Sequence, residues 1–144
     1  MIKQNLKIAK SVTPQTAGEL ISDLIGFFPV TETVKAPKSL NSGSRSYAVR
    51  VCGNCLSPIF QNEDVLIVDP DQKPVSGDCV VIWFNTGNTP IVKRLLLNLP
   101  PESMRFLKQD SAELLIICEQ LNPPKQYKIG FSKVKAVHKV LGKV

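Results

Sequence analysis

Short apolar runs, separated by turn-forming residues, follow one another along the chain from residue 47 onwards. In Tyr47-Ala-Val-Arg-Val51 apolar and polar positions alternate, whereas Val65-Leu-Ile-Val68 is apolar throughout. Both patterns are typical of strands, and Asn85-Thr-Gly-Asn-Thr89 is typical of a hairpin turn. Strands are predicted at 33–36, 47–52, 65–69, 78–84, 90–97, 104–109, 114–119 and 133–141. So many short strands predict a mostly β fold built on a twisted, partly closed sheet.

The segment before residue 30 has a different pattern. Apolar residues between Ala17 and Phe28 recur at helical spacing, Thr13-Pro14 is a suitable helix start, and Pro29 ends the pattern. Residues 1–12 carry little signal. We therefore expect a short N-terminal helical arm over 1–30 and a single domain over 31–144, since 144 residues suffice for one buried core.

Composition and charge narrow the class of protein only slightly. The net charge of +6 is compatible with a nucleic acid or an acidic protein as partner, but the basic residues are scattered along the chain and favour a solvated surface. No apolar run approaches the roughly 18 residues of a membrane span. The first ten residues lack the apolar core of a secretory signal, so we expect a cytoplasmic location.

The four cysteines raise the question of a metal or redox site. Cys52-x-x-Cys55 has the spacing of one half of a zinc site, but no second such pair exists and His138 is the only histidine. If Val51 faces the core, Cys52 faces the other way along the strand. Cys79 and Cys118 lie within apolar runs and are predicted to be buried thiols. We therefore predict no metal and no cofactor.

The stretch between the first two long strands is the candidate site. Gly53-Asn54 permits a sharp turn, Pro58 restricts the backbone, and Asn62-Glu-Asp64 is turn-prone. Cys55 lies in the bend. A nucleophile on a turn between two rigid strands is both accessible and firmly held.

This stretch resembles the nucleophile segment of the LexA/UmuD family, the self-cleaving peptidase domains of SOS repressors, phage repressors and polymerase-manager proteins. The family pattern Gly-x-Ser-Met-x-Pro corresponds to Gly53-Asn-Cys55-Leu-Ser-Pro58. The second family motif corresponds to Gly77-Asp-Cys-Val80 followed by Val92-Lys93-Arg94-Leu95. The resemblance covers roughly residues 27–141 and implies a LexA-like domain in which the lysine is the general base for the nucleophile.

The resemblance implies Cys55 as nucleophile and Lys93 as base, with the backbone N–H groups of Asn54 and Cys55 as oxyanion donors. A lysine acts as a base only when its amine is neutral near pH 7, which burial among apolar residues favours. Strand alternation places Lys93 on one face with Ile91 and Leu95. Because Cys55 and Leu56 replace the family's Ser and Met, a catalytically inactive dimerisation and regulatory module is the alternative. His138 is expected to be structural.

In this family the enzyme cuts its own chain in the N-terminal arm, commonly at Ala-Gly or Cys-Gly. Ala17-Gly18 fits that chemistry but lies in the expected helix, and Gly26-Phe27 is the other candidate. The family also implies a homodimer, a RecA-type filament or a polymerase as possible partners, and a bacterial or phage origin. About 40 residues before the first motif are too few for a DNA-binding domain, although a C-terminal repressor fragment would look similar. A signal-peptidase relative, which uses the same Ser–Lys logic, fits less well without a membrane anchor.

Overall fold

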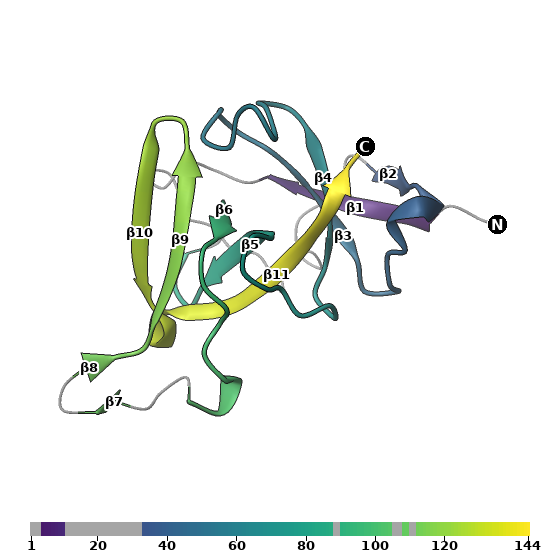
Figure 1. The fold of residues 1–144 in the computed structure, drawn as a ribbon. Helices are drawn as coiled ribbons and strands as arrows, with labels where there is room; N and C mark the ends of the chain where they lie inside the picture. The colour runs from purple at the N-terminus through teal and green to yellow at the C-terminus, as the bar shows by residue number, and fades with distance from the viewer. Residues whose placement is uncertain (1–3, 11–32, 88–89, 105–107, 110–111) are drawn as a thin grey trace.

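The computed structural model describes residues 4–10, 33–87, 90–104, 108–109 and 112–144 (Figure 1). The helices within these ranges are short 3-10 turns: η2 (Lys38–Leu40), η3 (Glu102–Met104) and η4 (Phe131–Lys133). The predicted mostly β fold is confirmed. The helical arm expected between residues 17 and 28 lies outside the described residues.

Eleven strands account for most of the described chain. They are β1 (Gln4–Lys10), β2 (Thr33–Ala36), β3 (Tyr47–Arg50), β4 (Val65–Asp69), β5 (Cys79–Phe84), β6 (Ile91–Leu95), β7 (Lys108–Gln109), β8 (Ala112–Glu113), β9 (Leu115–Leu121), β10 (Pro124–Gly130) and β11 (Val134–Lys143).

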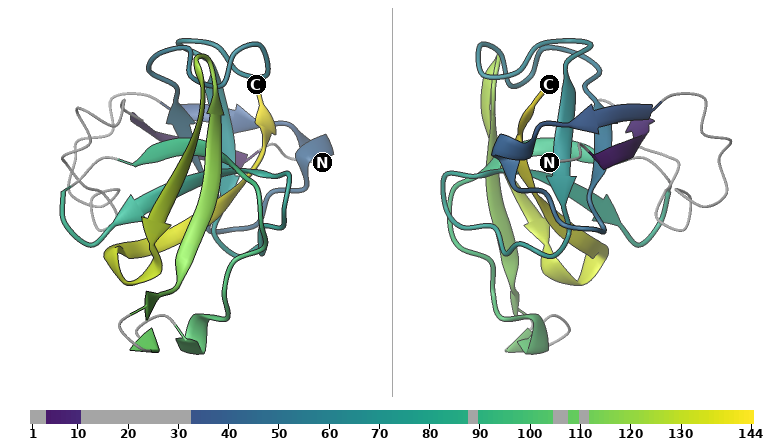
Figure 2. Two further views of the ribbon diagram at one scale, coloured as in Figure 1. Left: turned by 60° about the vertical axis from the view of Figure 1, so that its left-hand side comes forward. Right: turned by 90° about the vertical axis from the view of Figure 1, so that its right-hand side faces the viewer.

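Nine of these strands form one sheet in the order β10-β9-β6-β5-β11-β4-β3-β1-β2. Neighbours from β10 to β3 are antiparallel, β1 is parallel to β3, and β2 is antiparallel to β1. The sheet is open, because β10 and β2 are its two edges in this order. Figure 1 shows β11 crossing the molecule between the β9–β10 ribbon and the β3–β4 pair, and Figure 2 shows the same ribbon from two further directions.

The predicted strands at 33–36 and 65–69 are found with the same bounds, and those at 47–52, 78–84, 90–97 and 114–119 are found with shifted ends. Three strands were not predicted: β1, the two-residue β8 and β10. The strand expected at 104–109 is wrong at its start, because Met104 ends a 3-10 turn and only Lys108–Gln109 is extended among the described residues. The last strand begins at Val134 rather than Lys133, and it extends to Lys143.

The sheet is buried on both faces at β5. Along β5, Val81 and Trp83 belong to one apolar cluster, whereas Val80 and Ile82 belong to another. Their side chains are at most 2% exposed. Continuous apolar runs are what a strand covered on both faces requires, and Val-Val-Ile-Trp supplies one. Within the described residues, no helix is long and apolar enough to cross a membrane.

Candidate active site

The loop that joins β3 to β4 carries Cys55. Backbone hydrogen bonds from Val51 N–H to Asp64 O and from Glu63 N–H to Val51 O, both 2.8 Å, close the loop at its base. Gly53 adopts a φ of 98°, a left-handed conformation that side chains other than glycine's rarely tolerate. The glycine of the motif is therefore required by the turn that leads into Cys55.

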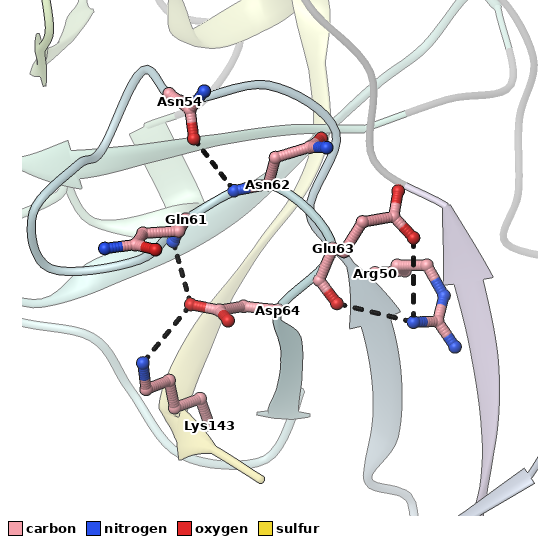
Figure 3. A network of polar contacts seen from close by, with 7 residues as sticks. All are labelled: Arg50, Asn54, Gln61, Asn62, Glu63, Asp64 and Lys143. Carbon is pink, nitrogen blue, oxygen red and sulfur yellow. Dashed lines mark hydrogen bonds and ion pairs between the residues drawn. The ribbon is translucent and has the colours of Figure 1, made fainter.

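Polar side chains brace this loop from inside and outside (Figure 3). The Asn54 side-chain oxygen accepts a 3.0 Å hydrogen bond from Asn62 N–H, and the Asn62 side-chain oxygen accepts one of 2.7 Å from Gly53 N–H. Asp64 accepts from Gln61 N–H at 2.8 Å and meets the Lys143 amine at 3.4 Å. These contacts fix the path of the loop on both sides of Cys55.

The residues at the bend are tied to the sheet as well. The Cys55 carbonyl accepts hydrogen bonds from Leu121 N–H at 2.7 Å and Asn122 N–H at 3.1 Å, which connects the loop to the end of β9. Leu56, which stands where the family has Met, is 1% exposed and packs in the first apolar cluster. Ser57 N–H donates to Asn54 O at 3.0 Å, so the chain turns tightly around Cys55.

Lys93 on β6 lies beside the Cys55 thiol. Its side chain is 1% exposed, and its Nζ atom is 3.8 Å from Cys55 Sγ. Cys55 itself is half-buried, with Sγ also 4.0 Å from the Val92 carbonyl oxygen. The structure therefore brings together the two side chains that the sequence motifs singled out, although they are far apart in the chain.

Two further side chains, which the sequence did not single out, surround the Lys93 amine. Gln120 at the end of β9 places its Oε1 atom 3.4 Å from Lys93 Nζ and is 8% exposed. Tyr127 on β10 places its ring centroid 4.9 Å from the same nitrogen. Extending the alternation of Ile116 and Cys118 by one step would have put Gln120 on the buried face, whereas β10 gave no strand pattern from which Tyr127 could be found.

The other cysteines are arranged as separate thiols. Cys52 is exposed, Cys118 is buried, and Cys79 is only half-buried, so the expectation of a fully buried Cys79 is wrong. Burial raises the pKa of the Cys79 and Cys118 thiols to about 11, in each case against a smaller opposing effect from a nearby basic residue. Among the described residues no cluster of His, Cys, Asp or Glu could hold a metal ion.

His138 is engaged elsewhere in the sheet. Its Nδ1 atom is 2.7 Å from the Tyr47 hydroxyl, and its ring meets the Tyr47 ring edge-on. Burial first, and then the positive charge of Arg45, lower the pKa of His138 to about 4 despite the opposing carboxylates of Asp71 and Asp69. The histidine is therefore neutral at pH 7.

The two predicted cleavage positions, Ala17-Gly18 and Gly26-Phe27, lie outside the described residues. The backbone of Asn54 and Cys55, predicted as the oxyanion donors, lies in the braced turn described above.

A β domain that holds a thiol beside a buried amine points to the class of peptidases that pair a nucleophile with a lysine. Comparison with family models agrees, because the model described as Peptidase S24-like matches residues 13–114, a range that includes Cys55 and Lys93. The chain belongs to this family, the LexA/UmuD-type peptidases, and the resemblance seen in the sequence is confirmed. No curated protein matches the chain significantly.

Proposed function

We propose that this protein is a self-cleaving peptidase in which Cys55 is the nucleophile and Lys93 accepts and returns its proton. The observation that carries the proposal is the 3.8 Å separation of Cys55 Sγ and Lys93 Nζ in a member of a peptidase family. The substrate is the chain's own N-terminal segment, cut between about residues 17 and 28, at Ala17-Gly18 or Gly26-Phe27. No cofactor enters the reaction.

The reaction uses the two groups in turn. The proton leaves Sγ for Nζ, and the sulfur then attacks the carbonyl carbon of the scissile peptide. As the C–N bond breaks, Lys93 returns the proton to the departing nitrogen, which leaves a thioester on Cys55. Water, deprotonated by the now neutral Lys93, hydrolyses the thioester and restores the thiol.

The bend around Cys55 supports the oxyanion role of Asn54 and Cys55. Backbone N–H groups stabilise a developing oxyanion only if they are held in place before the reaction. The Asn54–Asn62 and Gly53–Asn62 hydrogen bonds hold this turn. We therefore assign the oxyanion contacts to the backbone N–H groups of Asn54 and Cys55.

The family relationship suggests where such cleavage would act. LexA/UmuD-type domains serve SOS- and phage-type regulation of transcription or of translesion polymerases, and we propose the same setting here. A RecA-type filament or a polymerase would then be the partner, and a homodimer the assembly. Detection of cleavage only when a RecA-type filament is added would support this setting.

Cleavage is tested on the full chain. We expect incubation between pH 7 and 10 to yield two fragments whose junction, read by mass spectrometry, lies between residues 17 and 28. Cys55→Ala and Lys93→Met should leave the chain intact, whereas Cys52→Ala, a control in the same loop, should cleave as the parent does. A parent chain that stays as intact as Cys55→Ala across this pH range, with and without filament, would refute the proposal.

The alternative is an inactive domain of the same fold that acts as a dimerisation and regulatory module. The observation that favours it is the strand β10, a seven-residue strand that pairs with β9 on one side and with no other strand of the described residues, so its other edge could pair with a second chain. The replacement of the family's Ser by Cys55 agrees with lost activity. In that case Cys55→Ser would regain cleavage, and sedimentation would show a dimer; a monomer at all concentrations would count against it.

A further inference from the structure

We infer that Gln120 and Tyr127 clamp the Lys93 amine in its ammonium form, so that Cys55 rests as a thiolate before any substrate arrives. This deepens the proposed function, on which its catalytic meaning rests, and it makes Gln120 and Tyr127 positioning residues. We call their contacts with Lys93 and with each other the clamp.

The orientation of the Gln120 amide is fixed by three partners. Its Nε2 donates to the Pro123 carbonyl at 3.0 Å, so its Oε1 is the atom directed at the site. That oxygen accepts from the Tyr127 hydroxyl at 2.8 Å and from Lys93 Nζ at 3.4 Å. An amide held this way presents a permanent partial negative charge to the amine.

Tyr127 acts on the clamp through both its hydroxyl and its ring. Burial first, and then repulsion by the negative charge that Cys55 and Cys118 carry when ionised, raise the pKa of Tyr127, so the phenol keeps its proton and remains a donor to Gln120. The ring lies 4.9 Å from Lys93 Nζ, within the range in which a cation is attracted to an aromatic face. This attraction requires the charged amine, because a neutral amine gains little from the ring quadrupole.

A buried ammonium needs an anion, and Cys55 is placed to be that anion. None of the ion pairs among the described residues involves Lys93, and an unpaired buried charge is costly. Transfer of the proton from Sγ to Nζ supplies both charges at once: the S–H bond breaks and an N–H bond forms. The alternative is a neutral thiol that donates to the Val92 carbonyl, 4.0 Å from Sγ, and this arrangement leaves the clamp without a cation.

The thiol is what makes this resting state accessible. An ordinary thiol has a pKa of ~8.5, well below that of a serine hydroxyl, so a nearby amine can hold its proton outright. A nucleophile formed in advance needs no base at the moment of attack, and Lys93 then acts mainly as the acid that protonates the leaving nitrogen. The exchange of Ser for Cys at position 55 thus matches the cation-favouring surroundings of Lys93.

The test measures the pH dependence of Cys55 alkylation by iodoacetamide on the full chain, read for each cysteine by peptide mass spectrometry. A thiol of ordinary pKa loses about 70-fold in rate between pH 8 and pH 6, because only the thiolate reacts. We expect Cys55 to lose less than about 5-fold, whereas exposed Cys52, read in the same digest, provides the reference.

Variants then separate the clamp from a merely structural role. Gln120→Met and Tyr127→Leu should restore a steep pH dependence at Cys55, and Tyr127→Phe, which keeps the ring, should lie between. The matched control is Lys125→Met: the Lys125 amine lies 5.1 Å from the centre of the same ring, but the described hydrogen bonds of Lys93, Gln120 and Tyr127 do not involve it. A change in the accessibility of the Cys55 thiol alone would change its alkylation rate by the same factor at every pH. The shape of the pH profile would then stay the same.

The outcomes distinguish this inference from the proposed function. A Cys55 profile as steep as that of Cys52 in the parent would overturn the thiolate state, whether or not the chain cleaves. A flat parent profile that survives in all clamp variants would overturn the roles of Gln120 and Tyr127. A flat profile without any cleavage would support the clamp and contradict the proposed peptidase activity.

If the clamp variants fail to fold, the absorbance of the thiolate near 240 nm provides a second measurement. It is compared between the parent and Cys55→Ser at pH 6.5, and equal absorbance in the two proteins would overturn the inference.

Discussion

Four thiols in one chain differ in their surroundings, and at the scale of single residues this gives a direct prediction. Cys79 and Cys118 have a pKa raised to about 11 by burial and should be unreactive at pH 7.5. Cys52 is exposed and Cys55 half-buried, so both should react. Mass spectrometry of peptides after brief treatment with iodoacetamide should find label at two positions only. Label at Cys118 before global unfolding would contradict the burial described here.

Some residues of the candidate site could be predicted from sequence motifs, and others could not. Cys55 and Lys93 could be found because each stands in a short pattern whose spacing is characteristic of one family. Tyr127 could not be found, and strand alternation would have given only the burial of Gln120 and not its role, because both residues act through geometry rather than through a motif. An amide and a phenol become a clamp only when β9 and β10 pair, with Tyr127 opposite Cys118, and no local pattern carries that information.

At the scale of elements, the register between β6 and β9 decides whether the site is assembled. These strands pair through only two residue pairs, Arg94 with Glu119 and Leu95 with Cys118. Arg94 Nε and an Arg94 terminal nitrogen lie 2.8 Å and 2.6 Å from Glu119 Oε2. Because Lys93 precedes Arg94 and Gln120 follows Glu119, this ion pair holds the two site residues in register from the opposite faces of their strands.

We predict that Arg94→Gln or Glu119→Gln lowers the free energy of unfolding by about 0.5–1 kcal/mol, the range of a cross-strand charge pair. The double substitution should cost no more than the larger single one, as measured by urea unfolding in a double-mutant cycle. Arg45→Gln is the control, because the Arg45–Asp71 pair is 71% and 50% exposed and should contribute almost nothing. If Arg45→Gln lowered the free energy of unfolding as much as Arg94→Gln does, β6 and β9 would be held together by contacts other than the Arg94–Glu119 pair.

Buried strands could be predicted from the sequence, whereas the two edge strands differ: β2 was predicted at 33–36 and β10 was not. β5 is buried on both faces and reads as a continuous apolar run. β10 starts with proline and is mostly exposed, as an edge strand can be. β1 has only three apolar residues among seven and pairs with β2 and β3. Pairing partners, rather than local composition, define β1 and β10 as strands.

At the scale of the whole molecule, β11 holds the two parts of the sheet together. It pairs with β5 on one side and with β4 on the other, and its register shifts once along each partner. The order of the strands could not be predicted, because it depends on this last strand inserting between two that precede it by many residues. His138 lies near the middle of β11 and is one of its links to the core.

A hydrogen-bonded chain of three side chains joins β11 to β5 and β3. Trp83 Nε1 donates to the Tyr47 oxygen at 2.7 Å, and the same oxygen lies 2.7 Å from His138 Nδ1, to which the phenol donates when the histidine carries its proton on Nε2. Burial raises the pKa of Tyr47 against a smaller lowering by the Trp83 hydrogen bond, so the phenol stays protonated. The chain therefore requires a neutral His138 that accepts at Nδ1.

This requirement predicts a loss of stability in mild acid. The pKa of His138 is about 4 in the folded protein against 6.5 as its ordinary value, so between these pH values the unfolded chain binds more protons. The stabilisation is complete above pH 6.5 and falls as the pH drops to about 4, by roughly 2 kcal/mol after allowance for partial exposure. Urea unfolding at pH 7, 5.5 and 4.5, followed by the fluorescence of Trp83, the single tryptophan, measures it.

Two carboxylates of the described residues, Asp64 and Asp69, have a pKa lowered by folding, and they change charge at a lower pH than the histidine. The pKa of Asp64 is lowered by the Gln61 N–H and by Lys143. Burial would raise that of Asp69, but the N–H groups of Asp71 and Gly43 and the Gln72 amide outweigh it. Their stabilisation is present above a pH of about 3.8 and is lost only below it.

The control for the histidine is His138→Gln, which keeps an acceptor for Tyr47 but cannot titrate. The free energy of unfolding of this variant should change little between pH 6.5 and 4.5. The parent's acid loss persisting in His138→Gln would assign it to other groups and contradict the neutral histidine in the core.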